Sequence, residues 1–178
     1  MIKLKTLTVK NFLSVGNVTQ ALKFDQHGLT LVLGNNLDLG GDGSRNGTGK
    51  TTIVNALSFV LYGNALTNIR KDNLINKTNS KQMLVTCEFD CEGHSYRIER
   101  GRKPNVLRFI VDDKETDSLE TEEQQGENKE TQADIERILG MGHDMFKHIV
   151  ALNTYTEPFL SLKTNDQRDI IEQLLGIT

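Results

Sequence analysis

The residues best suited to chemistry lie in one polar segment, Ser44-Arg45-Asn46-Gly47-Thr48-Gly49-Lys50-Thr51-Thr52. Gly47 and Gly49 can adopt positive φ angles, so successive backbone N–H groups can point into one concavity that fits phosphate oxygens. Lys50 offers a mobile positive charge to the β- and γ-phosphates of a nucleotide, and the Thr51 hydroxyl is a hard oxygen ligand for Mg²⁺. The pattern predicts a phosphate-binding loop (P-loop) rather than a glycine-rich turn that only connects two elements. Its predicted cofactor-binding residues are Arg45, Asn46, Gly47, Thr48, Gly49, Lys50, Thr51 and Thr52.

A P-loop needs a strand before it and a helix after it, and the sequence offers both. Residues 29–33 (LTLVL) form a continuous β-prone run, typical of a parallel strand buried on both faces. Residues 50–62 are apolar nearly all round, which predicts a buried helix that ends at Gly63 and adds its N-terminal dipole to the phosphate site. Ser44 stands where the usual pattern has glycine, and about eight extra residues (LDLGGDGS) follow Gly34-Asn35-Asn36. We therefore expect an enlarged loop whose phosphate-contacting half is intact.

The other elements follow from alternation and from helical periodicity. Strands are predicted at residues 3–10, 21–24 and 106–111, with a hairpin of 84–89 and 96–99. Helices are predicted at residues 131–139, 144–152 and 165–175. The fold class is therefore α/β, with an antiparallel subsheet beside a P-loop core.

Composition limits the remaining possibilities. The 178 residues, 37 % of them apolar, suit one globular domain without a membrane span or a signal peptide. Cys87 and Cys91 would lie about 13 Å apart along a strand, which predicts two reduced thiols of a cytosolic protein. The four histidines (His27, His94, His143, His148) share no spacing with carboxylates and are interpreted as structural or surface residues.

Charge is distributed unevenly along the chain. The net charge of −3 combines +7 over residues 1–111 with −7 over residues 112–130 and −3 thereafter. The acidic stretch 112–130 has one apolar side chain, Leu119, and predicts a flexible, solvated insertion. Arg70, Lys71, Lys77 and Lys81 form a basic stretch that is either a sequence-blind contact for a DNA backbone or an ordinary solvated face.

Several motifs in one order point to a family: VKNFLSVG, LTLVLGNN, NGTGKTT, LYG, IRKDNLIN, YRIERGRKPN, MFKHIVALN, EPFLSL and RDIIEQLLGI. Together they resemble the N-terminal half of the ATPase subunit of the SbcC and Rad-fifty type, most closely its bacteriophage members. These are ABC-type ATPases related to SMC proteins. The resemblance implies that residues 1–178 are the N-terminal lobe of a split ATPase head. A coiled coil would start near residues 164–178, and a C-terminal half would carry the Walker B acid and the signature motif.

The resemblance also implies a function. The chain would be the ATP-binding subunit of a nuclease complex for DNA double-strand-break repair and recombination, with ATP and Mg²⁺ as cofactors. The implied partners are its own C-terminal half, a second copy, an SbcD-type metal-dependent nuclease and the DNA backbone, in the cytoplasm (the host's for a phage protein). ATP hydrolysis would be incomplete without the C-terminal half. The alternatives are an SMC- or RecF-like DNA clamp and a self-contained small P-loop kinase or GTPase.

Two positions carry implied roles beyond the loop. Asn153 aligns with a family glutamine that helps to coordinate the metal and the attacking water, so Lys50 and Asn153 are the implied catalytic residues, and Thr51 and Asn153 the implied Mg²⁺ ligands. Capping of a helix end is the alternative for Asn153. The family's phosphate-contacting basic residue is Leu13 here, so that contact does not carry over, while residues 75–77 lie where the family approaches the nucleotide.

Two segments superficially resemble the Walker B and signature motifs. Residues 109–113 (FIVDD) look like a Walker B strand, but they follow a hairpin strand without the crossover that a parallel sheet requires. Residues 39–42 (LGGD) look like a signature motif but lack its serine and precede the P-loop. We expect neither segment to supply the missing function.

Overall fold

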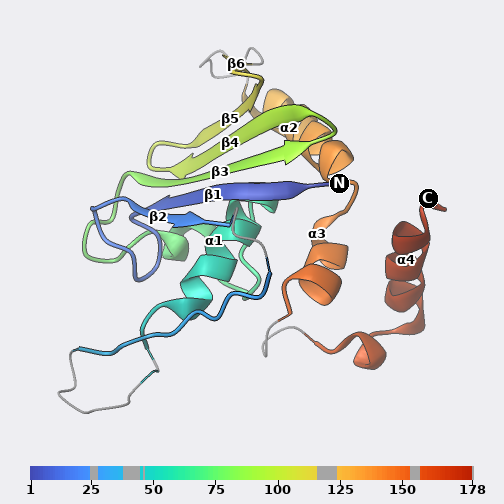
Figure 1. The fold of residues 1–178 in the computed structure, drawn as a ribbon, viewed down its shortest axis with the longest axis horizontal. Helices are drawn as coiled ribbons and strands as arrows, with labels where there is room; N and C mark the ends of the chain where they lie inside the picture. Colours follow the sequence, from blue (N-terminus) through green and yellow to red (C-terminus); the bar gives the residue numbers. More distant parts are fainter. Residues whose placement is uncertain (25–27, 38–44, 46, 116–123, 153–156, 178) are drawn as a thin grey trace.

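The computed structural model describes residues 1–24, 28–37, 45, 47–115, 124–152 and 157–177. Its largest element is a six-stranded sheet in the order β2-β1-β3-β4-β5-β6, and every described pair of neighbouring strands is antiparallel (Figure 1). The strands are β1 (Lys3–Lys10), β2 (Gln20–Lys23), β3 (Met83–Cys91), β4 (His94–Arg102), β5 (Val106–Val111) and β6 (Lys114–Glu115).

The predicted hairpin is confirmed, with longer strands than the pattern indicated. Cys91 pairs with His94, so a two-residue turn of Glu92 (φ 52°) and Gly93 (φ 86°) joins β3 to β4. Two positive φ angles in succession are typical of a type I′ turn, whose twist matches that of the strands it joins. The third antiparallel strand, β5, has the predicted bounds.

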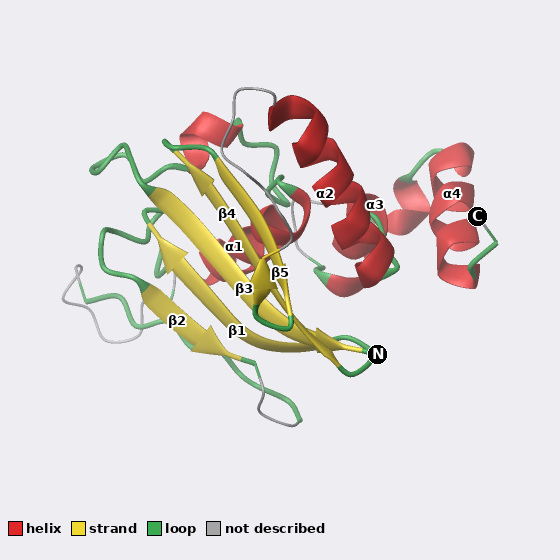
Figure 2. Ribbon diagram, turned by 90° about the horizontal axis from the view of Figure 1, so that it is seen from above, coloured by secondary structure: helices red, strands yellow, loops and turns green. Residues whose placement is uncertain are grey.

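The two faces of the sheet differ in character. Figure 2 shows the described helices on one side of the sheet and none of them on the other. On β3 the alternate residues Met83, Val85, Cys87, Phe89 and Cys91 are buried. They form the core with Leu7 and Val9 of β1 and with residues of the helices.

The helices begin and end at defined residues. They are α1 (Lys50–Tyr62), η1 (Lys71–Leu74), α2 (Gln124–Leu139), α3 (His143–Met145), the π-helical turn η2 (Phe146–Val150), η3 (Phe159–Ser161) and α4 (Thr164–Leu175). α1 has the predicted bounds, and Gly63 (φ 72°) ends it by donating its N–H to the Phe59 carbonyl at 2.8 Å.

The helix α2 departs from the prediction. It begins at Gln124 rather than at residue 131, so the end of the acidic stretch predicted as flexible is helical. Ile135 and Leu139 of α2 are buried in the core. These contacts stabilise a helix whose first residues are polar. Residues 116–123 of the acidic stretch lie outside the described residues.

The prediction of a buried parallel strand at residues 29–33 is wrong for this structure. The segment forms no strand, and Leu29 (103 % exposed), Leu31 (79 %) and Leu33 (62 %) face solvent. A strand buried on both faces needs neighbouring strands and covering layers. Among the described residues, every strand belongs to the antiparallel sheet, so this run has nothing to pair with.

The cysteines and the lengths of the helices bear on two further predictions. Cys87 and Cys91 are free and buried, and burial raises the pKa of the Cys87 thiol to about 12. No described helix combines the length and apolarity that crossing a membrane would require.

Candidate functional site: the loop before helix α1

The end of the predicted P-loop has the required backbone conformation. Gly47 (φ 73°) and Gly49 (φ 83°) are both left-handed, and α1 begins directly after them at Lys50. The Thr52 N–H donates to the Gly49 carbonyl at 3.0 Å, which closes the first turn of the helix. The positive end of the α1 dipole and the N–H groups of its first turn therefore meet at the loop.

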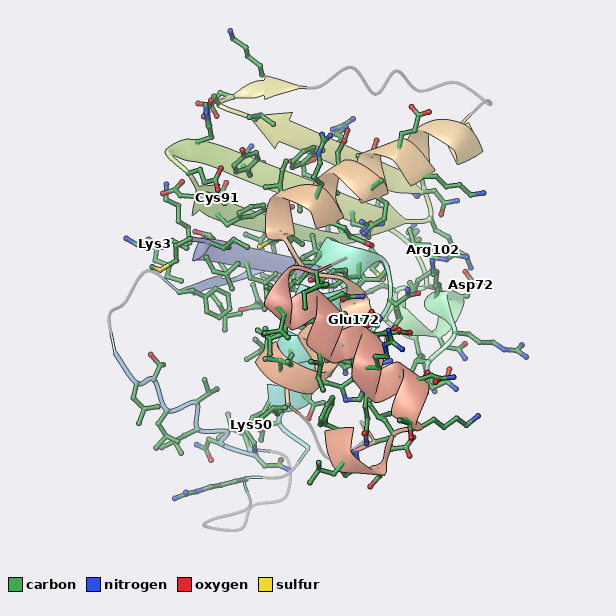
Figure 3. The ribbon with its side chains drawn as sticks, turned by 90° about the vertical axis from the view of Figure 1, so that its right-hand side faces the viewer. Lys3, Lys50, Asp72, Cys91, Arg102 and Glu172 are labelled. Carbon is green, nitrogen blue, oxygen red and sulfur yellow. The ribbon has the colours of Figure 1, made fainter. Side chains whose placement is uncertain are left out.

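The Lys50 side chain folds back across this loop. Its ammonium donates to the Arg45 carbonyl and lies 3.5 Å from the Thr48 hydroxyl, which itself donates to the Arg45 carbonyl at 3.3 Å. Figure 3 shows Lys50 at the start of α1, beside the extended segment that precedes the loop. Lys50 thus holds its positive charge at the loop, where nucleotide phosphates can replace the carbonyl as its partner.

The segment after residue 33 reaches the same loop. A Cβ added to Gly34 would lie 1.8 Å from Thr48 Oγ1, so only glycine permits this close approach. A Cβ added to Gly47 would lie 4.0 Å from Asn36 Nδ2. Gly34 and Asn36 therefore border the phosphate-contacting half of the loop, which fits the interpretation of Gly34-Asn35-Asn36 as the start of an enlarged P-loop.

Sequence reasoning did not identify Ser14 as part of the site. Ser14 Oγ lies 2.9 Å from Thr52 Oγ1, and the Thr52 side chain is buried. The usable signal was a hydroxyl-bearing residue in the turn directly after β1, but its 38-residue separation from Thr52 hides the contact in sequence.

An asparagine network ties this turn to the loop after α1. Asn76 donates its backbone N–H to the Asn11 carbonyl at 2.8 Å and its side-chain N–H to the Leu13 carbonyl at 2.9 Å. Asn79 Nδ2 donates to Asn11 Oδ1 at 2.8 Å. Residues 75–77, predicted to approach a nucleotide, are thus linked to the phosphate loop through the turn that carries Ser14.

The remaining predicted site residues divide into two groups. Thr51 lies exposed at the start of α1, so its hydroxyl oxygen is available to Mg²⁺ alongside phosphate oxygens, which are the hard ligands that this ion prefers. Asn46 and Asn153 lie outside the described residues. Within the described ranges, no group of three or more His, Cys, Asp or Glu residues could hold a metal ion.

The basic stretch lies on the surface. Arg70, Lys71, Lys77 and Lys81 are all exposed. Partial burial, together with Arg100 and Arg102, lowers the pKa of Lys71. Arg102 also pairs with Asp72 at 2.6 Å, a contact visible in Figure 3.

The topology of the sheet excludes residues 109–113 as a Walker B strand. β5 pairs antiparallel with β4 and β6, so it is no member of a parallel P-loop sheet. Asp112 and Asp113 form the turn to β6, and Asp112 Oδ2 lies 2.6 Å from His94 Nδ1 on the surface. Its hydrogen bond with His94 lowers the pKa of the Asp112 carboxyl. Residues 39–42, the segment similar to a signature motif, all lie outside the described residues.

Taken with the sheet that packs on α1, the two left-handed glycines and Lys50 define a P-loop nucleotide-binding domain. A family model described as "AAA domain" matches residues 6–178, and the chain belongs to this family. Exonuclease subunit 2 of Enterobacteria phage T4 is 34 % identical over 177 residues, which are 98 % of this chain and 29 % of the relative. A DNA double-strand break repair Rad50 ATPase from Methanococcus maripaludis is 26 % identical over 98 % of this chain and 16 % of its own length.

Solved structures support the same fold. One described as "Structural biochemistry of ATP-driven dimerization and DNA stimulated activation of SMC ATPases" matches with a TM-score of 0.61 and 20 % identity. The match covers 97 % of this chain and 99 % of that one. The predicted fold class and the resemblance to the SbcC and Rad-fifty type are thereby confirmed. The chain spans less than a third of the length of the curated relatives described above.

Proposed function

We propose that this chain is the ATP-binding N-terminal lobe of the ATPase subunit of a nuclease complex that repairs and recombines DNA double-strand breaks. The observation that carries the proposal is the P-loop geometry at Lys50, set in a chain 34 % identical to a phage exonuclease subunit. ATP binding and hydrolysis would drive dimerisation and regulate the processing of DNA ends. The nuclease itself would be a separate, SbcD-type subunit.

The chain's own residues hold the phosphates. Backbone N–H groups of the loop, together with the Lys50 ammonium now bonded to the Arg45 carbonyl, would bind the oxygens of the β- and γ-phosphates. Thr51 would offer its hydroxyl oxygen to Mg²⁺, and the ion would neutralise charge on the phosphates. Asn153 is proposed to orient the attacking water.

The exposed segment at residues 28–37 supports a second lobe as partner. Leu29, Leu31 and Leu33 would be buried if strands from the C-terminal half packed beside residues 29–33, because an exposed β-prone segment can accept a further strand. Two leucines of α4 are also exposed, Leu174 (54 % exposed) and Leu175 (63 % exposed). Such exposure is expected of a helix that packs against the second helix of an antiparallel coiled coil. The C-terminal half would add the Walker B acid and the signature serine.

A steady-state ATPase assay tests the proposal. The 178-residue chain should hydrolyse ATP hardly at all, and adding the C-terminal half in trans or through a short linker should restore turnover and dimerisation. Lys50→Ala in the same assembly should abolish turnover. Robust turnover by the chain alone, lost on substitution of Asp112 or Asp113, would contradict the proposal and favour a self-contained NTPase.

Partner binding separates the remaining alternative. An SMC- or RecF-like DNA clamp would share the ATPase behaviour but would not bind an SbcD-type nuclease. Co-purification of the assembled head with such a nuclease, with and without ATP, therefore distinguishes the two functions.

A further inference from the structure

The turn after β1 brings one hydroxyl to the end of the phosphate loop. Ser14 Oγ lies 2.9 Å from Thr52 Oγ1, and a Cβ added to Gly49 would lie 2.9 Å from the same Ser14 oxygen. Ser14 therefore contacts the buried residue in the first turn of α1 and lies against the last loop glycine. Lys50 and Thr51 stand between these two positions in the chain.

The turn that carries Ser14 is held in a costly conformation. Leu13 has a φ of 48°, in the left-handed region that bulky L-residues rarely adopt. Its N–H donates to the Leu74 carbonyl at 2.7 Å, and its carbonyl accepts from Asn76 Nδ2 at 2.9 Å. Such a backbone persists where its surroundings determine it, so the Ser14 backbone has a fixed position and its hydroxyl is held by the bond to Thr52.

The same turn holds α1 at a second point. Phe12 is fully buried, and its ring centroid lies 5.6 Å from that of Phe59. Thr52 and Phe59 are seven residues apart in sequence, about two turns, and so lie on one face of the helix. The Phe12–Phe59 and Ser14–Thr52 contacts together fix both the rotation of α1 and its position along its axis relative to β1.

We propose that Ser14 is a positioning residue for the phosphate-binding loop. Acting through Thr52, its hydroxyl holds the loop N–H groups and the side chains of Lys50 and Thr51 where nucleotide phosphates and their cation meet them. The inference rests on the proposed ATP-binding function. It adds that β1 and the loop after α1 set the geometry of the phosphate site from outside the motif.

Titration of the chain with fluorescently labelled ATP in the presence of Mg²⁺ tests this role. Ser14→Ala should weaken binding by about 3-fold to 10-fold, the effect of removing one hydrogen bond. Ser14→Thr, which keeps the hydroxyl, should bind like the wild type. Ser95→Ala, which removes a hydroxyl bonded to Asp90 on the far end of the sheet, is the matched control and should change nothing.

A double-mutant cycle identifies the route of the effect. Thr52→Val should weaken binding, and adding Ser14→Ala to it should weaken binding little further, because both substitutions break the same hydrogen bond. Circular dichroism and thermal melts check that each variant folds, and Thr52→Val tests the same hydrogen bond should Ser14→Ala unfold the chain.

The contrary outcomes are distinct. Wild-type affinity in Ser14→Ala, failure of Ser14→Thr to rescue, or fully additive effects with Thr52→Val would each overturn the positioning role. A wild-type chain that binds ATP no better than Lys50→Ala would overturn the proposed function itself, and this inference with it.

Discussion

Ser58 Oγ lies 3.0 Å from His143 Nε2 and joins the phosphate-binding helix α1 to the C-terminal helices. The Ser58 hydroxyl donates to the Asn64 carbonyl at 2.8 Å, so the His143 ring must donate its Nε2 proton to Ser58. The Tyr62 ring also packs on His143, with its centroid 5.2 Å from that of the imidazole. A fully buried serine thus depends on a titratable partner.

The burial of the His143 ring predicts a pH dependence of stability. Burial, and then Lys147, lower the pKa of His143 below its ordinary value of 6.5, although Asp144 and Glu136 oppose the shift. The folded state therefore binds fewer protons than the unfolded state, and stability that is present above pH 6.5 declines as the pH falls through the folded pKa. Urea unfolding should show a drop in the free energy of unfolding between about pH 7.5 and about pH 5.5.

Substitution of His143 identifies the source of that drop. His143→Gln keeps an N–H donor but does not titrate, so its free energy of unfolding should fall less between the two pH values. Lys23→Gln, on the exposed edge strand β2, is the control and should fall as much as the wild type. Part of the drop should remain in His143→Gln, because burial also lowers the pKa of His148. An unchanged drop in His143→Gln would contradict the assignment.

Lys50→Ala should abolish nucleotide binding and leave the fold intact. The Lys50 side chain contacts only loop atoms in its described hydrogen bonds and contributes nothing to the core, so the substitution removes charge and not packing. Titration with labelled ATP and circular dichroism measure the two effects separately. Lys23→Ala, on the exposed edge strand β2, is the matched control. Wild-type affinity or a collapsed spectrum would defeat this role.

Ile135→Ala should destabilise the chain by about 2–5 kcal/mol, the usual cost of truncating a fully buried aliphatic side chain. Ile171→Ala, at a residue 43 % exposed on α4, should cost much less. Urea unfolding monitored by circular dichroism gives both values. Equal, small effects would show that α2 contributes little to the core despite its burial.

The basic stretch should bind DNA through its charges alone. Arg70→Gln, Lys77→Gln and Lys81→Gln together should weaken the binding of duplex DNA and flatten its dependence on salt. The log–log slope should fall by about 0.9 for each DNA phosphate that the variant no longer neutralises. The control is a second triple variant that removes three positive charges from the C-terminal part of the chain: Lys129→Gln, Arg137→Gln and Lys163→Gln. Equal weakening in both triple variants would indicate a general effect of net charge.

Local patterns predicted most of this fold. The alternation of β1, the turn residues Glu92 and Gly93 and the glycine after α1 each act within a few residues, so their consequences are visible in sequence. The left-handed conformations of Gly47 and Gly49 and the start of α1 at Lys50 were predictable for the same reason. α2 was predicted too short because its first residues are polar and it depends on packing of Ile135 and Leu139 against the sheet.

What sequence patterns missed depends on distant partners. The burial predicted for residues 29–33 requires neighbouring strands, which no local pattern can guarantee. Ser14 belongs to the site only because Leu74 and Asn76 fix its turn, and those residues lie about 60 positions further along the chain. Both outcomes follow from tertiary context rather than from propensity.

The exposed leucines at residues 29–37 also govern how the isolated chain behaves in solution. A β-prone aliphatic run that is exposed to solvent, such as residues 29–33, is a template for strands of other molecules. The isolated chain should therefore self-associate as its concentration rises, with a steady increase in light scattering. Leu31→Lys, which places a charge in the middle of the run, should restore solubility without touching the core, because Leu31 is 79 % exposed.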